Sequence, residues 1–534
     1  MNQLQMLKKA MIAYVNSVKF IWSAIAYPLA VIGSKTTKVK DYKIYGNSVQ
    51  DGTPATDNPV EVQSVGELTT KNLWKGVNYI KSTGDSPVCI QYATAQSNDW
   101  VRSGVTVTVS ATVCVNDART NMRLVVFAQC VDKSISLGQT RIDYSVKGQE
   151  IRVAATYKIP ETDSEIERLV IRPLDYSSNS SGVFDAYVKD IQIELGDTAT
   201  EFEPYNKYRI PVTVRGKNLW KGSNYLKSAV GSEILRQYVY ASSNKWLKSG
   251  KSFTISVTAF VSENDTRIVP RLNATVYATD GTVITGNTVN YGEKNKEGRY
   301  HLRISMPNTT KEISHLVILF MNYSDNPGGV WDAYVKDIQI EIGDIATNYE
   351  PYIKPQEINI FLNEPLRKIG NHIDYIDFGR RVVVRNVGEC VVTSNMVVDK
   401  NAWYYNIGWN AYMIKISDFT MYFNQWQTGE LSNYLKCTPN THTSADLGEN
   451  YVFQAGSSNY VYIITTRASD ETVGEIKSWI DEMYNSGRPL KFTLRRNIST
   501  EESVSLPKLP QFQGTTIYEI QTRVLPSGMQ VKYC

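Results

Sequence analysis

The chain has 534 residues, which is too long for one hydrophobic core and predicts about three or four domains. Its 57 basic and 53 acidic side chains give a formal net charge of +4, and no run of five or more Lys or Arg occurs, so nucleic acid is not an expected partner. The 34 tyrosines and 10 tryptophans form an aromatic surplus that favours sheet cores or contact surfaces.

Residues 1–40 are predicted to hold a helix for oligomerisation or docking. Apolar residues step by three and four positions, as in the a/d seam of a coiled coil, until Pro28 ends the pattern. A signal peptide or membrane anchor over residues 10–32, after Lys8 and Lys9, stays open, as does a helix packed on its own domain. The predicted seam consists of Leu4, Leu7, Met11, Tyr14, Val18, Ile21 and Ile25.

An internal duplication follows an extended β arm that we expect over residues 41–69. The string Lys-Asn-Leu-Trp-Lys-Gly at 71–76 recurs at 217–222, and Asp-Ala-Tyr-Val-Lys-Asp-Ile-Gln-Ile-Glu at 185–194 recurs at 332–341. Because both strings recur at nearly the same distance along the chain, they mark the beginning and the end of a structural module that occurs twice.

The first module spans residues 70–205 and the second spans residues 206–352. Inside each, apolar residues alternate with Thr or Ser, as at 105–113 and 253–261, and Ser-, Asn- and Gly-rich turns separate such runs. About 140 residues of short strands suit a jelly roll or two-sheet sandwich. The expected fold class is therefore mainly β, with tandem jelly-roll modules between an N-terminal helix and a C-terminal domain.

The C-terminal domain is predicted over residues 353–534 as β-rich α+β, with a helix from Ser469 to Asn485. Each module ends in Glu-Pro-Tyr, at 203–205 and 350–352, before an alternating strand, and the proline favours a stiff junction.

The six cysteines show no C-x-x-C spacing, and Cys89, Cys114 and Cys130 fall in the first module while the second holds none. We expect free thiols, which favours folding in a reducing cytoplasm.

Glycan-binding jelly rolls use exposed rings, because the C–H face of a sugar stacks on an aromatic face while amides and carboxylates bind its hydroxyls. Trp74 and Trp220 are predicted to be core residues, since folding needs them in both modules. For the other repeated rings, core packing and binding stay open. The candidate glycan-binding residues are Trp100, Trp246, Tyr92, Tyr238, Asn98 and Asn244.

No cofactor is expected, although Asp185 and Asp332 are candidate ligands of a structural calcium ion, with solvated carboxylates as the favoured alternative. The chain has four histidines and no H-E-x-x-H, G-x-S-x-G or P-loop string, so we expect no enzyme activity. A glycosidase pair of carboxylates about 5–10 Å apart stays open, because sequence does not show which carboxylates meet in space.

Several strings resemble tail and minor structural proteins of phages and prophages of Gram-positive bacteria. The longest runs from Lys43 to Gly66 and leads into Lys-Asn-Leu-Trp; others lie at 363–370, 374–378 and from 506 to 529. In that group the repeated module is similar to carbohydrate-binding-module-type jelly rolls.

The resemblance implies a virion protein of a tail or fibre, assembled in the host cytoplasm among other virion proteins. We predict host-surface attachment, with a host cell-surface glycan as a partner, and fibre analogy suggests a homotrimer. Fold alone does not fix function. The alternatives are an architectural spacer, a head-decorating fibre, a glycan-degrading tail enzyme and a membrane-anchored bacterial adhesin.

Overall fold

The structure is a computed structural model, and it confirms the predicted class: the fold is mainly β. The chain divides into two compact units, one of residues 64–210 and 360–366 and the other of residues 1–63, 211–359 and 367–534, and each is described by itself. The structure describes residues 18–20, 31–33, 39–50, 52–82, 89–117, 120–132, 135–144, 147–178, 185–228, 235–323, 329–400, 411–420, 431–437, 451–453, 460–465, 473–512, 514–520 and 522–533.

At the N-terminus, strand β1 (Val18–Phe20) pairs antiparallel with β2 (Val31–Gly33). Val18 therefore lies in a strand and not in the predicted helix, consistent with the preference of β-branched and aromatic residues for sheets. The remaining predicted seam residues, Leu4, Leu7, Met11, Tyr14, Ile21 and Ile25, lie outside the described residues.

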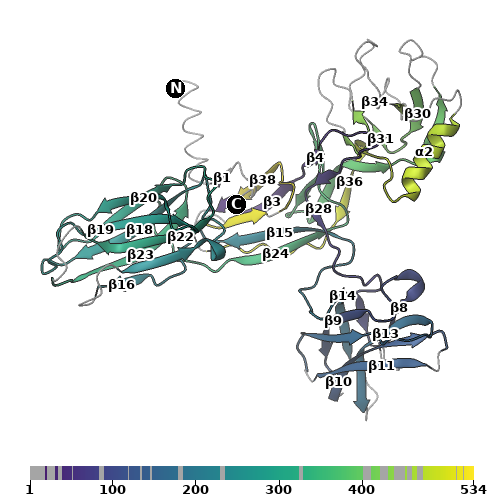
Figure 1. The fold of residues 1–534 in the computed structure, drawn as a ribbon, viewed down its shortest axis with the longest axis horizontal. Helices are drawn as coiled ribbons and strands as arrows, with labels where there is room; N and C mark the ends of the chain where they lie inside the picture. The colour runs from purple at the N-terminus through teal and green to yellow at the C-terminus, as the bar shows by residue number, and fades with distance from the viewer. Residues whose placement is uncertain are drawn as a thin grey trace. The chain divides into compact units, whose positions relative to one another are not determined.

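Module 1 is a sandwich of two four-stranded antiparallel sheets, ordered β12-β9-β14-β7 and β11-β10-β13-β8 (Figure 1). In chain order this is the strand arrangement of a jelly roll, built from two interleaved Greek keys. The strands are β7 (Tyr79–Lys81), β8 (Gln91–Thr94), β9 (Thr106–Val115), β10 (Thr120–Cys130), β11 (Ser136–Tyr144), β12 (Ile151–Lys158), β13 (Ile166–Ser178) and β14 (Ala186–Leu195).

Module 2 repeats this topology, with sheets ordered β21-β18-β23-β16 and β20-β19-β22-β17. The duplicated sequence thus folds into a duplicated jelly roll, as predicted. Its strands are β16 (Tyr225–Lys227), β17 (Arg236–Tyr240), β18 (Ser252–Val261), β19 (Arg271–Ala278), β20 (Val283–Asn290), β21 (Gly298–Ser305), β22 (Ile313–Asn322) and β23 (Ala333–Ile342).

The period-two pattern places one face of each strand in a core between the two sheets. Along β9, the inward residues from Val107 to Val115 are at most 2% exposed. Trp74 and Trp220 are each 5% exposed and belong to the cores of their modules, which confirms the prediction for this pair. Trp220 packs edge-on against Phe320, with ring centroids 5.5 Å apart.

The asparagine of the repeated Lys-Asn-Leu-Trp string joins the start of each module to its end. The buried Asn72 amide donates to the carbonyls of Ile191 (3.1 Å) and Glu203 (2.9 Å). Its carbonyl accepts from the backbone N–H groups of Trp74 (2.9 Å) and Ile193 (3.1 Å). Asn218 makes the four equivalent bonds in module 2. A buried amide needs its partners, so this residue type is required at both positions.

The C-terminal domain contains a sheet ordered β31-β36-β28-β27-β3-β38, with β32 also paired to β36, and a second sheet ordered β29-β30-β35-β34-β33. The segment predicted as an extended arm supplies β3, which pairs with β27 and β38. The strands of these sheets are β3 (Val39–Tyr45), β27 (Tyr375–Asp377), β28 (Val382–Val391), β29 (Val397–Lys400), β30 (Ala411–Lys415), β31 (Phe419–Thr420), β32 (Leu431–Ser432), β33 (Lys436–Cys437), β34 (Tyr451–Phe453), β35 (Tyr460–Ile464), β36 (Lys491–Ser503) and β38 (Gly528–Tyr533).

The predicted C-terminal helix is present as α2 (Gly474–Asn485), which buries Ile476, Ile480 and Met483 at the four- and three-residue spacing of one helix face. These residues join a core with strands of both sheets. The described part of the chain has no helix that is both long and apolar enough to cross a membrane.

The connectors after the two modules are strands β15 (Tyr208–Arg215) and β24 (Gln356–Leu362), which are neighbours in one sheet. In the larger unit, residues 212–215 of β15 pair with β37 (Ile517–Ile520), and Arg215 Nη2 lies 2.6 Å from Glu519. The remaining elements are β4 (Ser48–Gln50), β5 (Val62–Ser64), β6 (Glu67–Leu68), β25 (Lys368–Ile369), β26 (His372–Ile373), η1 (Ala95–Ser97), η2 (Ala241–Ser243) and η3 (Ser394–Met396).

Cys114, Cys130 and Cys390 are free thiols, in agreement with the prediction. Cys534 lies outside the described residues.

Candidate functional site

The two tryptophans predicted as glycan-stacking candidates do not lie in open grooves. Trp100 is 8% exposed and belongs to the core of module 1. Trp246 is half-buried and meets Phe253 edge-on, with centroids 5.3 Å apart. The polar Ser-Asn segment before each ring forms a short 3-10 turn, and the ring that follows it folds inward because the sandwich end has apolar surface to cover.

The two candidate asparagines stabilise these turns. The Asn98 side-chain amide donates to the carbonyl of Thr94, and Asn244 donates to the carbonyl of Tyr240, both at 2.9 Å. Both donor groups therefore serve the local backbone.

Tyr92 and Tyr238, by contrast, are exposed at 45% and 48%. They occupy equivalent positions on β8 and β17, opposite Val170 and Val317. The Arg168 guanidinium lies over the Tyr92 ring, 4.3 Å from its centroid, so this cation–π contact covers one face of that ring.

Module 2 gathers further rings around Tyr238, and we name Tyr238, Tyr240, Tyr277 and His315 the aromatic face. Tyr240 and Tyr277 lie opposite His315 on its two sides, so the three rings form a row across β17, β22 and β19. The His315 ring lies 5.8 Å from both Tyr238 and Tyr240, and 5.3 Å from Tyr277, with which it stacks at 15°. Such a row can stack the apolar faces of sugar rings.

Hydrogen-bonding groups border the aromatic face. The His315 Nδ1 and Ser314 hydroxyl lie 2.9 Å apart, and Tyr240 is 53% exposed. Sequence reasoning missed Tyr240, Tyr277 and His315. Tyr240 follows Tyr238 by two residues, a spacing that puts both on one strand face, whereas Tyr277 and His315 required the strand register.

The equivalent surface of module 1 has different chemistry. Thr94, Arg168 and Gln129 occupy the row that Tyr240, His315 and Tyr277 form in module 2. Arg168 Nε donates to Gln129 at 2.9 Å.

Below that row, Val125, Phe127 and Val170 form a small apolar cluster on the outer side of the same sheet. The Arg172 guanidinium lies 5.2 Å from the Phe127 ring centroid. Arginines therefore lie over the Tyr92 and Phe127 rings, and among the described residues of this sheet no row of rings corresponds to the aromatic face.

Each candidate calcium ligand lies beside a lysine of its own module. Asp185 pairs with Lys81 at 3.6 Å and Asp332 with Lys227 at 3.8 Å, and all four side chains are about half exposed. Among the described residues, no group of three or more His, Cys, Asp or Glu is placed to hold a metal ion. A lysine ammonium beside each carboxylate does not fit a calcium site, which needs six or more oxygen ligands.

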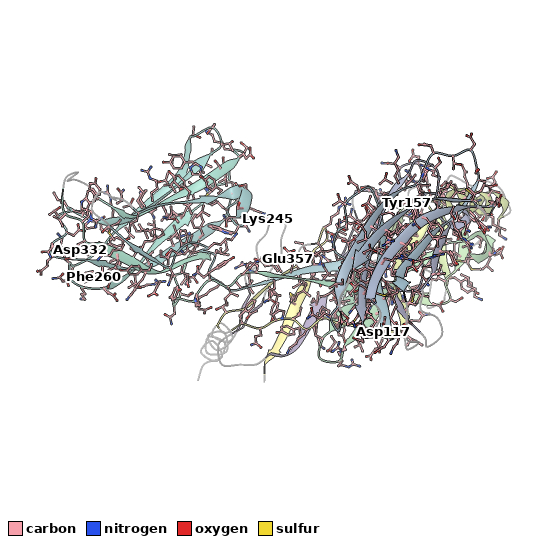
Figure 2. All side chains as sticks on the ribbon, turned by 90° about the horizontal axis from the view of Figure 1, so that it is seen from below. Asp117, Tyr157, Lys245, Phe260, Asp332 and Glu357 are labelled. Atoms are coloured by element: carbon pink, nitrogen blue, oxygen red, sulfur yellow. The ribbon has the colours of Figure 1, made fainter. Side chains whose placement is uncertain are left out.

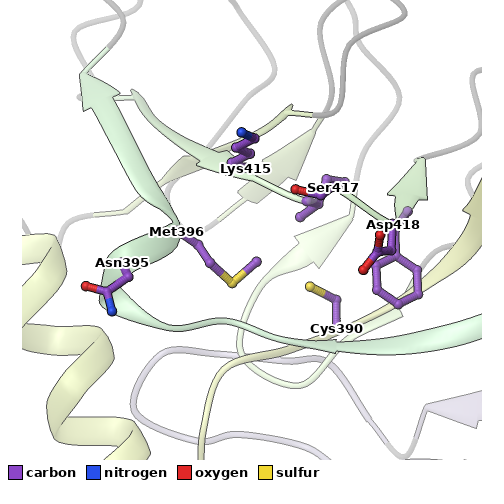
Figure 3. Close-up of a pocket in the computed structure, with 8 residues that line it drawn as sticks. Cys390, Asn395, Met396, Lys415, Ser417 and Asp418 are labelled. Atoms are coloured by element: carbon purple, nitrogen blue, oxygen red, sulfur yellow. The ribbon is translucent and has the colours of Figure 1, made fainter.

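A pocket of about 240 Å³ lies in the C-terminal domain. Figure 3 shows the Cys390 thiol turned toward Met396, and Lys415, Ser417 and Asp418 also line the pocket. Burial, followed by the neighbouring carboxylates of Asp418 and Glu389, raises the pKa of the Cys390 thiol to about 11. The thiol is therefore neutral near pH 7 and is a poor nucleophile or metal ligand.

Comparison with known proteins gives likenesses of low similarity. No protein-family model matches the chain, and no curated protein matches it. Among solved structures, the tandem CBM22-1-CBM22-2 domain of Paenibacillus barcinonensis Xyn10C is 14% identical over 53% of this chain and 98% of its own, with a TM-score of 0.21.

Two further solved structures illustrate the range. A chain in the structure of infectious bursal disease virus, Gx strain, is 11% identical to this protein, and the match covers 66% of this chain and 80% of that chain, with a TM-score of 0.18. A secreted protein of Parabacteroides distasonis is 10% identical over 62% and 94%, with a TM-score of 0.14. At these TM-scores none of the three supports an argument about function.

Proposed function

We propose that the chain is a non-enzymatic structural protein of a bacteriophage particle, of the tail or fibre type, and that it attaches the particle to a host-surface glycan through the aromatic face of module 2. The phage assignment is supported by the resemblance of the Lys43–Gly66 string and of the strings in the C-terminal domain. The glycan assignment is supported by one observation, the row of rings around His315.

Three features of the aromatic face support a glycan as its ligand. The rings lie on a sheet, which positions them more rigidly than a loop would. Tyr238 and Tyr240 are about half exposed, so their removal from water would contribute to binding. Side-chain hydroxyl and imidazole groups lie beside the rings and can donate to or accept from sugar hydroxyls.

A matched pair of variants tests this proposal. Tyr238→Ala with Tyr240→Ala removes two exposed rings, and we expect a loss of about 1–3 kcal/mol of binding free energy to whole cells or a glycan array. Tyr92→Ala, the equivalent position in module 1, is the control, because Arg168 already covers that ring. Equal binding by the double variant, the control and the wild type would refute the glycan assignment.

The virion assignment has its own test, immunogold labelling of purified particles with antibodies against the full chain. Gold at the tail or its fibres supports the proposal, and particles without label contradict it.

A further inference from the structure

A second group of aromatic residues lies on the other sheet of each module, and we name it the tyrosine row. In module 2 it consists of Tyr225, Tyr334 and Phe260, on the neighbouring strands β16, β23 and β18. The Tyr225 and Tyr334 centroids lie 5.5 Å apart, and Phe260 stacks on Tyr334 at 5.1 Å and 18°. Tyr225 is 51% exposed, so the row ends in solvent.

Module 1 carries the same row with one replacement. Tyr79 stacks on Tyr187 at 5.6 Å and 28°, and Tyr79 is 55% exposed. Cys114 lies opposite Tyr187 as Phe260 lies opposite Tyr334. The module 1 row therefore has two rings and a thiol where the module 2 row has three rings.

One carboxylate and one ammonium group border each row in the same way. In module 2 the Tyr334 hydroxyl donates to Glu297 at 2.5 Å, and Lys336 Nζ lies 2.6 Å from the same carboxylate. The hydrogen bond to Glu297 raises the pKa of Tyr334, so its hydroxyl keeps its proton near neutral pH.

In module 1 the corresponding distances are 2.6 Å from the Tyr187 hydroxyl to Glu150 and 2.7 Å from Lys189 to Glu150. The glutamate and the lysine beside each row therefore have a net formal charge of zero.

The row lies at one end of the module. Figure 2 shows Phe260 and Asp332 together at the end of module 2 that lies away from Lys245. Asp332 and Lys227 form an ion pair, and Lys227 lies opposite Tyr334 in the strand register. A further carboxylate and ammonium group therefore stand beside the rings, again without net charge.

Between the two copies of the module, three of the four aromatic-face positions differ, whereas two of the three tyrosine-row positions agree. On the aromatic face, His315 and Tyr240 correspond to Arg168 and Thr94. On the tyrosine row, both tyrosines, the glutamate and the lysine recur. Core packing does not explain this agreement, because the end tyrosine of each row is about half exposed.

We propose that the tyrosine row is a second carbohydrate-binding surface, present once in each module, and that its ligand is a neutral polysaccharide. The rings offer apolar surface for stacking, and the bordering carboxylate and ammonium accept from and donate to sugar hydroxyls. The balanced charge does not favour a polyanion. Two sites on one chain would raise the avidity for a repeating polymer. The ligand class rests on the proposed function, but the site does not.

The test is affinity electrophoresis of the full chain in native gels that contain barley β-glucan, xylan, galactomannan or dextran, with alginate as the polyanion. The starting protein carries Tyr238→Ala and Tyr240→Ala, so that binding by the aromatic face does not contribute to the result. We expect this protein to be retarded by at least one neutral polymer. Adding Tyr79→Ala and Tyr225→Ala should weaken the apparent association by about 2- to 12-fold per ring.

A reciprocal exchange provides a gain of function. Cys114→Phe supplies module 1 with the third ring, and we expect stronger retardation; Phe260→Cys removes it from module 2, and we expect weaker retardation. Thermal melting of each variant checks that the fold is retained.

The outcomes separate the two sites. If the aromatic-face variant alone abolishes retardation by every neutral polymer, or if the tyrosine variants and the exchange leave retardation unchanged, the tyrosine row is not a glycan site. Stronger retardation by alginate than by the neutral polymers also overturns the proposal. If retardation is lost only when the tyrosine row is changed, the tyrosine row is a glycan site and the aromatic face is not.

Discussion

The fully buried ion pair of module 2 should be decisive for that module's stability. Asp265 and Arg267 are each 0% exposed at the side chain. Asp265 Oδ1 accepts from the backbone N–H of Arg267 at 3.0 Å and from its Nε at 2.8 Å, and Oδ2 accepts from the backbone N–H of Asp332 at 2.9 Å. The change Asp265→Asn keeps the shape of the side chain but leaves the guanidinium without its counter-charge.

The expected cost follows from that loss. Breaking a buried ion pair on one side costs about 3–5 kcal/mol, because the remaining charge stays in a low-dielectric interior. Arg267 also has the Met321 carbonyl at 3.4 Å and the Ser228 hydroxyl at 3.5 Å, and neither of these two acceptors is close enough to replace a carboxylate. At 1.36 kcal/mol per factor of ten, this corresponds to a fall of roughly 10²- to 10⁴-fold in the folding equilibrium of the module.

Hydrogen–deuterium exchange of the full chain, followed by mass spectrometry, measures this change. Amides of β18 and β23 should lose protection by the predicted factor, because these strands exchange through opening of the module. The control is Asp344→Asn, whose half-exposed carboxylate pairs with Arg303 at 2.9 Å and should contribute less than about 1 kcal/mol. A change of less than threefold in the Asp265 variant would refute the reasoning.

Three further predictions concern single groups. Gly222→Ala should lower the melting temperature of module 2 in calorimetry, at a cost of about 1–3 kcal/mol, because the new Cβ would lie 2.4 Å from Cζ2 of the Trp220 ring; an unchanged melting temperature would show that the ring moves freely. Cys390 should react with iodoacetamide at pH 8 far more slowly in the native than in the unfolded chain, as measured by mass spectrometry, because burial raises its pKa to about 11; equal rates would contradict the burial. Burial opposes ionisation of Asp265, but hydrogen bonds from Arg267 outweigh it and lower its pKa, so its contribution to stability is present above the unfolded pKa of about 3.9 and is lost as the pH falls through the folded pKa. Melting temperatures from pH 6 down to pH 2.5 should therefore fall more steeply in the wild type than in Asp265→Asn, and parallel curves would argue against this linkage.

The duplicated modules could be predicted from sequence because their signals are local. Period-two alternation identifies a half-buried strand without knowledge of its partner, and the repeated strings fix the module ends. The structure adds the reason for one of these strings, since Asn72 holds both ends of module 1 together through four hydrogen bonds.

Features that depend on pairing between distant segments were not predictable in this way. Strand β3 lies between β27 and β38, which follow it by more than 300 residues in the chain. The periodicity of a strand does not indicate which distant segment pairs with it. The aromatic face has the same origin, because Tyr240, His315 and Tyr277 meet only through the register of three strands. For Trp100 the sequence left core packing and binding open, and only the tertiary packing shows that the ring is buried.

The duplication itself allows core and surface requirements to be told apart within one chain. Positions that serve folding should agree between the modules, as Trp74 and Trp220 do, and positions without a role common to both modules should diverge, as Gln129 and Tyr277 do. A position that is exposed and yet agrees needs a third explanation. Tyr79 and Tyr225 are such a pair, and their shared Glu and Lys neighbours extend the agreement beyond single residues. Cross-strand contacts alone would account for the inner tyrosines, but the half-exposed outer rings gain little from them. Binding at a surface common to both modules accounts for the inner and outer rings together, whereas divergence of the aromatic face leaves module 2 with a recognition surface of its own.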